Sequence, residues 1–118
     1  MFLVIDIGNT NTVFAIYERL KSGFELLKSF RISSDLKRTP DEYSLIINQS
    51  FKFNNYNLKN IDGVAIASVV PEILNNIEIY FRNNLKLPIF KVEADKLNIE
   101  INIQNPNEAG QDRLINAF

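Results

Sequence analysis

The chain has 118 residues, of which 46% are apolar, and its formal net charge is −1. This is enough apolar sequence for one small domain with its own core. The near-neutral charge argues against nucleic acid or an anionic membrane surface as a partner. The absence of Cys and His excludes disulfides, thiol nucleophiles, Ser-His-Asp triads and thiolate or imidazole zinc sites. The remaining carboxylates, amides and hydroxyls suit chemistry with Mg²⁺ and phosphate oxygens, although structural domains can share this composition.

No apolar run approaches the roughly 18 residues that a membrane span needs. The first apolar run has no basic segment ahead of it, so it does not resemble a signal peptide. We therefore expect a cytoplasmic protein without a membrane partner.

The first third of the chain predicts three strands in a row. Residues 2–7 predict a strand, and the uninterrupted apolar run at residues 2–5 indicates that it is buried on both faces. Residues 12–18 predict a second strand, paired with the first through a turn at Gly8 and Asn9. Residues 24–32 predict a third strand after a turn at Ser22 and Gly23, which completes an antiparallel meander.

Helices and strands alternate after the meander. Thr39, Pro40 and Glu42 give the pattern of a helix start, with Thr39 as N-cap, Pro40 in the first position and Glu42 closing a capping box. Residues 63–70 predict a buried strand, and a second helix then starts at Pro71. The residues that we expect on the inner faces of the two helices are Tyr43, Ile46, Ile47, Ser50 and Phe51 in the first, and Leu74, Ile77, Phe81 and Leu85 in the second.

Residues 88–92 predict another strand, and residues 99–103 a short additional one. The order β-β-β-α-β-α-β predicts an α/β fold, in which helices flank a mixed, ribonuclease-H-like sheet. The phenylalanines that we expect in the core are Phe14, Phe24, Phe30, Phe51, Phe81 and Phe90.

Seven mostly small and polar residues, DIGNTNT at positions 6–12, join the first two strands. Gly8 allows close approach of a ligand, and the Asn and Thr residues after it add amide, hydroxyl and backbone N–H donors that could cradle phosphate oxygens. Asp6, at the end of the first strand, could hold Mg²⁺ directly or through water. These residue types are also ordinary in hairpins, so the spacing alone leaves a plain turn as an alternative.

A second polar motif, Gly110-Gln111-Asp112-Arg113, lies where a loop is expected to enter a helix. The N-terminus of a helix attracts anions, so the motif could bind an anionic group. The alternative is that Asp112 only compensates the helix dipole and that Arg113 is a solvated cation.

Together, these motifs resemble those of one protein family. Asp6 to Thr10 after the first strand looks like the first phosphate loop of the superfamily that contains acetate kinase, sugar kinases, Hsp70 and actin, and its GNT form resembles the type III pantothenate kinases. The segments that agree with that family in order and spacing are Asp41-Glu42-Tyr43, Ser68-Val69-Val70-Pro71, Asn105-Pro106 and Gly110-Gln111-Asp112-Arg113.

The resemblance implies an actin-like ATPase domain that phosphorylates pantothenate to 4′-phosphopantothenate, the first step of coenzyme A biosynthesis, with ATP and Mg²⁺. It implies that Asp112 is the general base and that Gly110, Gln111, Asp112 and Arg113 bind the substrate. The expected ligand of the metal is Asp6, from its place at the end of the first strand. The residues expected at the nucleotide are Asp6, Ile7, Gly8, Asn9, Thr10, Asn11, Thr12 and Val13. Many family members have an aromatic residue where this chain has Ile103, so Ile103 is given no role.

Family members have two similar domains and form homodimers. The resemblance therefore implies that residues 1–118 are the N-terminal domain and that they are inactive alone. The helix expected to begin near residue 110 shows no stop signal, neither Gly, Pro nor a basic last turn, so we expect the chain to be cut inside it. The resemblance places the site for K⁺ or NH₄⁺ in the missing second domain. The alternatives are another small-molecule kinase of the superfamily, or a nucleotide-binding regulatory protein without catalytic activity.

Overall fold

A computed structural model describes residues 1–93 of the chain. Within them the strands are β1 (Phe2–Ile7), β2 (Asn11–Leu20), β3 (Gly23–Ser33), β4 (Gly63–Ser68) and β5 (Ile89–Glu93); the helices are α1 (Pro40–Phe53), a short 3₁₀ turn (Leu58–Asn60) and α2 (Pro71–Asn84). The strand at 99–103 and the motif at 110–113 lie outside the described residues.

The strands form one mixed sheet in the order β3-β2-β1-β4-β5. β1 pairs antiparallel with β2 and parallel with β4, while β3 is antiparallel to β2 and β5 is parallel to β4. The meander followed by parallel crossovers is therefore confirmed as an α/β fold of the ribonuclease-H type. Central placement of β1 explains the unbroken apolar run at residues 2–5, because a central strand is covered on both faces.

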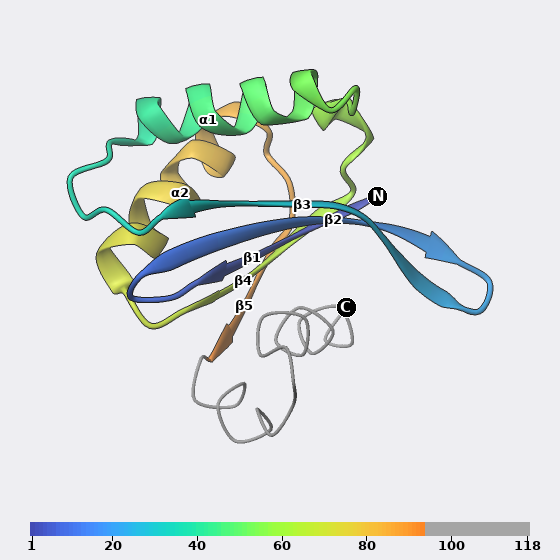
Figure 1. The fold of residues 1–118 in the computed structure, drawn as a ribbon, viewed down its shortest axis with the longest axis horizontal. Coiled ribbons are helices and arrows are strands. Elements are labelled where there is room, and N and C mark those ends of the chain that lie inside the picture. The colour runs from blue at the N-terminus through green and yellow to red at the C-terminus, as the bar shows by residue number, and fades with distance from the viewer. Residues whose placement is uncertain (94–118) are drawn as a thin grey trace.

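Both α-helices cover the same face of the sheet (Figure 1). Alternate residues of β1 (Leu3, Ile5 and Ile7) belong to the core on this face. Its fully buried members are Leu3, Ile5, Ile7, Phe14, Ile16, Tyr43, Ile47, Phe51, Ile61, Val64, Ile66, Ile73, Ile77, Tyr80 and Phe81. This layer fixes the positions of the helices and so the loops that enter them.

The opposite face of the sheet carries smaller side chains. Its buried cluster consists of Val4, Ala15, Tyr17, Ala65 and Ala67. The alternation along β1 places Asp6 on this face as well, one pleat beyond Val4. Asp6 therefore points away from α1 and α2.

One predicted detail of the core is wrong, and two are confirmed only in part. Phe90 is 44% exposed instead of buried, since it lies on β5, the last strand of the sheet. In α2, the buried stripe includes Ile73 and Tyr80, whereas Leu74 and Leu85 are only partly buried at its margin.

The strand predicted to end at residue 70 ends at Ser68. The Ser68 hydroxyl accepts from the N–H of Val70 at 2.8 Å and donates to the Val70 carbonyl at 2.9 Å. These local bonds take the place of the hydrogen bonds between strands, so the strand ends here. Pro71 then occupies the first position of α2.

The predicted start of α1 is confirmed in detail. The Thr39 hydroxyl accepts from the Glu42 N–H at 3.2 Å, and the Glu42 carboxylate accepts from the Thr39 N–H at 3.2 Å. We expect Thr39→Ala to lower the free energy of unfolding by about 1 kcal/mol, because it leaves the Glu42 N–H at the helix end without its partner. Urea unfolding measures this loss, and Thr39→Ser, which keeps the hydroxyl, is the control. Equal stability of Thr39→Ala and the unmodified protein would contradict the assignment.

Candidate functional site

Three loops meet at one end of the sheet, on the left in Figure 1. They are Gly8–Thr10 between β1 and β2, residues 34–39 between β3 and α1, and Val69–Val70 between β4 and α2. The Val69 N–H donates to the Ile7 carbonyl at 3.0 Å, and the Ser34 N–H donates to the Thr10 carbonyl at 2.8 Å. These two bonds join all three loops into one polar rim, which includes the first predicted motif.

The β1–β2 loop is a tight turn closed by the Gly8 N–H, which donates to the Asn11 carbonyl at 2.9 Å. None of its residues has the positive φ angle that the usual two-residue hairpin turns require. Gly8 is needed for space, because a Cβ there would lie 3.1 Å from the Asn11 carbonyl oxygen. The turn therefore depends on close backbone approach and on contacts from outside the hairpin.

The tip of this loop offers unused hydrogen-bond donors. Asn9, Thr10 and Asn11 are exposed. Within residues 1–93, the backbone N–H groups of Asn9 and Thr10 donate to no acceptor. Adjacent free N–H groups in a tight turn form a concave site for an anion such as phosphate.

The eight residues predicted at the nucleotide differ in exposure. Ile7, Thr12 and Val13 are buried, so their side chains cannot reach a ligand and only support the loop. Asp6 and Gly8 are half-buried. The groups that can touch a ligand are therefore the Asp6 carboxylate and the atoms at the tip of the loop.

Asp6 lies between Val13 of β2 and Ala67 of β4 in the sheet. These neighbours shield the carboxylate from water, and this burial raises the pKa of Asp6 above its ordinary value. A cation bound nearby would offset that cost. Residues 1–93 contain no group of three acidic side chains that could hold a metal alone, but Mg²⁺ often takes one carboxylate, with substrate phosphates and water supplying the other ligands. Asp6 fits that arrangement.

Sequence analysis missed one residue of this rim, Ser34. Its hydroxyl donates to the Gly8 carbonyl at 2.6 Å and lies 2.9 Å from the hydroxyl of Thr12. The signal available in the sequence was weak: two serines at the end of the predicted third strand. Their contact with the β1–β2 loop is tertiary and follows from strand register.

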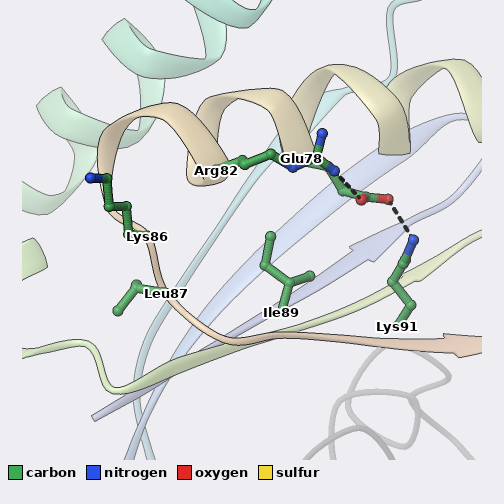
Figure 2. A pocket seen from close by; sticks show the side chains of 6 residues that line it. All are labelled: Glu78, Arg82, Lys86, Leu87, Ile89 and Lys91. Atoms are coloured by element: carbon green, nitrogen blue, oxygen red, sulfur yellow. Dashed lines mark hydrogen bonds and ion pairs between the residues drawn. The ribbon is translucent and has the colours of Figure 1, made fainter.

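A hollow between α2 and β5 lies toward the other end of the sheet, where Ile89 pairs with Val64 at the start of β4. It is lined by Glu78, Arg82, Lys86, Leu87, Ile89 and Lys91. Figure 2 shows the Glu78 carboxylate between Arg82 and Lys91, at 3.4 Å and 3.3 Å from their nitrogens. Glu78 therefore already forms ion pairs with two of the cations that line the hollow. The pair with Lys91 joins α2 to β5, so we interpret this cluster as structural.

In the described part of the chain, no helix is both long enough and apolar enough to cross a membrane. The second predicted motif, Gly110 to Arg113, lies outside the described residues. Of the site predicted from the sequence, the structure describes only the residues around the β1–β2 loop.

Solved structures with a similar fold include Holliday junction enzymes. RuvC of Thermus thermophilus in complex with Holliday junction substrate has a TM-score of 0.61 and 9% identity, and the match covers 97% of this chain and 89% of that one. The fowlpox virus resolvase with substrate Holliday junction DNA has a TM-score of 0.54 and 14% identity, with 99% and 97% covered. At these identities the likeness shows the ribonuclease-H-like fold alone.

Family membership comes from the sequence. The model of one protein family, described as type III pantothenate kinase, matches residues 2–118, nearly the whole chain. The match includes the polar loop at the end of β1 and the segment with Asp112. The chain therefore belongs to the type III pantothenate kinase family.

Proposed function

We propose that this chain is the N-terminal domain of a two-domain cytoplasmic kinase, which transfers the γ-phosphoryl group of ATP to the 4′-hydroxyl of pantothenate. The observation that carries the proposal is the family match over residues 2–118, together with free N–H donors at the loop after β1. Phosphoryl transfer requires mainly positioning and stabilisation of charge, so a cradle for phosphate is the feature expected of such a site.

The β1–β2 loop binds phosphate oxygens of ATP in this proposal. The N–H groups of Asn9 and Thr10 and the exposed side chains of Asn9, Thr10 and Asn11 are the donors. Asp6 holds Mg²⁺ directly or through a water molecule. The ion would supply positive charge to neutralise the phosphate oxygens.

The motif at residues 110–113 binds pantothenate in this proposal. Asp112 accepts the proton of the 4′-hydroxyl of pantothenate. The hydroxyl oxygen bonds to the γ-phosphorus of ATP, and ADP leaves. Gly110, Gln111 and Arg113 hold the substrate in place. A carboxylate is a suitable base here, because in-line transfer requires a correctly placed proton acceptor. The second domain completes the ATP site and holds a monovalent cation, and the active protein is a homodimer.

Gly8→Ala tests the phosphate cradle. A Cβ at Gly8 would lie 3.1 Å from the Asn11 carbonyl oxygen, so Asn11 must move and the loop donors move with it. We expect the affinity of the full-length protein for MgATP to fall roughly tenfold, as expected when one or two hydrogen bonds are lost.

Gly23→Ala is the matched control for this substitution. Gly23 lies at the start of β3, and its Cβ would meet no atom within 4 Å, but its φ of +136° makes alanine strained there. Gly23→Ala should therefore lower thermal stability and leave MgATP affinity unchanged. Equal losses of affinity in the two variants would show that Gly8 acts only through general stability.

The alternative functions are phosphorylation of another hydroxyl compound, or nucleotide binding without catalysis. One experiment distinguishes these alternatives from pantothenate phosphorylation. The full-length protein is incubated with MgATP, K⁺ and each of several hydroxy acids, and ³¹P NMR identifies the products. We expect a phosphomonoester on pantothenate and none on the other compounds. A phosphomonoester on a different acceptor would change the substrate, and its absence with every acceptor, despite ATP binding, would favour the non-catalytic alternative.

A further inference from the structure

The turn between β1 and β2 is held by one serine from another strand end. Ser34, directly after β3, makes three hydrogen bonds to it. Its N–H donates to the Thr10 carbonyl at 2.8 Å, its hydroxyl donates to the Gly8 carbonyl at 2.6 Å, and the Thr12 hydroxyl lies 2.9 Å from the same oxygen. These bonds therefore reach residues 8, 10 and 12, which are every second residue of the segment proposed to bind phosphate.

The direction of these bonds can be assigned. A carbonyl oxygen only accepts, so the single hydroxyl proton of Ser34 is used at Gly8. The Thr12 hydroxyl must then donate to Ser34. Thr12 is fully buried, and a buried hydroxyl requires a partner. The resulting relay runs from Thr12 through Ser34 to Gly8.

This relay sets the direction of the Asn9 N–H, one of the two free donors at the tip. A peptide unit is planar, with its C=O and the following N–H pointing in opposite directions. The bond that Ser34 makes to the Gly8 carbonyl therefore turns the Asn9 N–H away from Ser34. The Ser34 N–H, by its bond to the Thr10 carbonyl, fixes the peptide unit between Thr10 and Asn11 in the same way, so the Thr10 N–H lies between two fixed peptide units.

Contacts of the neighbouring residues fix the position of Ser34 itself. Ser33, its neighbour, pairs with Asn11 in the sheet, and the Arg38 guanidinium donates to the Ser33 carbonyl. The Asn76 side chain of α2 donates to the Arg38 carbonyl at 3.0 Å. These contacts connect the serine to the helix layer, so it can act as a fixed support for the turn.

We infer that Ser34 is a positioning residue for the nucleotide, which holds the β1–β2 loop in the conformation that presents its N–H groups to phosphate. The inference rests on the proposed function only in assuming that this loop binds the phosphates of a nucleotide. It does not depend on pantothenate as the acceptor. The turn lacks the positive φ angles that would stabilise an independent hairpin, so the support has to come from outside.

Calorimetric binding of MgADP to the full-length protein tests the inference. Ser34→Ala should weaken binding by roughly three- to tenfold, as expected when one or two hydrogen bonds are lost. Ser34→Thr, which keeps the hydroxyl, should bind nearly as the unmodified protein does. Ser29→Ala is the matched control: Ser29 lies on β3, the strand that ends just before Ser34, is exposed, and its side chain makes no hydrogen bond within residues 1–93.

A serine that only supported the fold would lower the melting temperature without changing the affinity of the folded protein. MgADP affinity in Ser34→Ala within twofold of the unmodified protein would therefore overturn the inference. If Ser34→Ala does not fold, Thr12→Val removes the other hydroxyl of the relay at nearly constant volume, and unchanged affinity there would overturn it equally.

The two proposals can fail separately. Binding of MgADP without phosphorylation of pantothenate would overturn the proposed acceptor, while the comparison of Ser34 variants remains decisive for the serine. A full-length protein that binds no MgADP would overturn both proposals.

Discussion

Asp112→Asn is expected to lower kcat of the full-length protein by about 100- to 10,000-fold, the range that loss of a general base gives. The amide has nearly the shape of the carboxylate but cannot accept the proton of the pantothenate hydroxyl. The affinity for MgATP and the melting temperature should remain close to those of the unmodified protein. Steady-state ADP release and calorimetric binding measure these quantities.

Asp62→Asn is a suitable control for Asp112→Asn. Asp62 is exposed, pairs with the N-terminal amine at 2.8 Å, and lies just before β4, at the opposite end of the sheet from the polar rim. The same chemical change there should leave kcat intact. If Asp112→Asn also retained its kcat, the proposed base would be wrong, although the fold and the family would stand.

Asp6→Asn is expected to lower kcat with MgATP by about 10- to 100-fold, as loss of a carboxylate that orients a metal or its water typically does. Raising the Mg²⁺ concentration should restore part of the activity, since the variant has lost affinity for the ion. Activity equal to that of the unmodified protein at limiting Mg²⁺ would contradict a metal role for Asp6.

The same substitution should stabilise the protein when Mg²⁺ and nucleotide are absent. Burial raises the pKa of Asp6 in the folded state, so the folded protein binds this proton more tightly than the unfolded chain. Stability is then lost as the pH rises from the unfolded pKa, about 4, through the folded pKa. Asp6→Asn removes this loss, so its advantage in urea unfolding should grow from pH 4 toward neutral pH. An advantage independent of pH would show that desolvation is not the cause.

Much of the fold could be predicted because local sequence and tertiary structure agree. The unbroken apolar run of β1 matches its central position, and Thr39 with Glu42 forms the capping box that its spacing predicts. The predictions were wrong where contacts between distant parts of the chain determine burial, or where a side chain ends a strand. Phe90 has an apolar side chain but lies on β5, an edge strand, and Ser68 ends β4 through its own hydroxyl before the apolar sequence ends.

The candidate site could be predicted only in part. The composition of the β1–β2 loop predicted a phosphate cradle or a plain turn, and the position of Asp6 at the end of the first strand predicted a metal ligand. The face of the sheet that Asp6 occupies follows only from the two buried clusters. The burial of Ile7, Thr12 and Val13 and the support from Ser34 depend on which strands are neighbours. Contacts between residues 22 or 26 positions apart, such as those of Ser34 with Thr12 and Gly8, leave no periodic signal in the sequence.

The most direct test of the account is pantothenate-dependent release of ADP by the full-length protein with MgATP and K⁺. The account predicts that ADP appears only when pantothenate is present and in equal amount to 4′-phosphopantothenate. Release of ADP at the same rate without pantothenate, or no release with it, would contradict the proposed reaction and leave the ribonuclease-H-like fold and family membership.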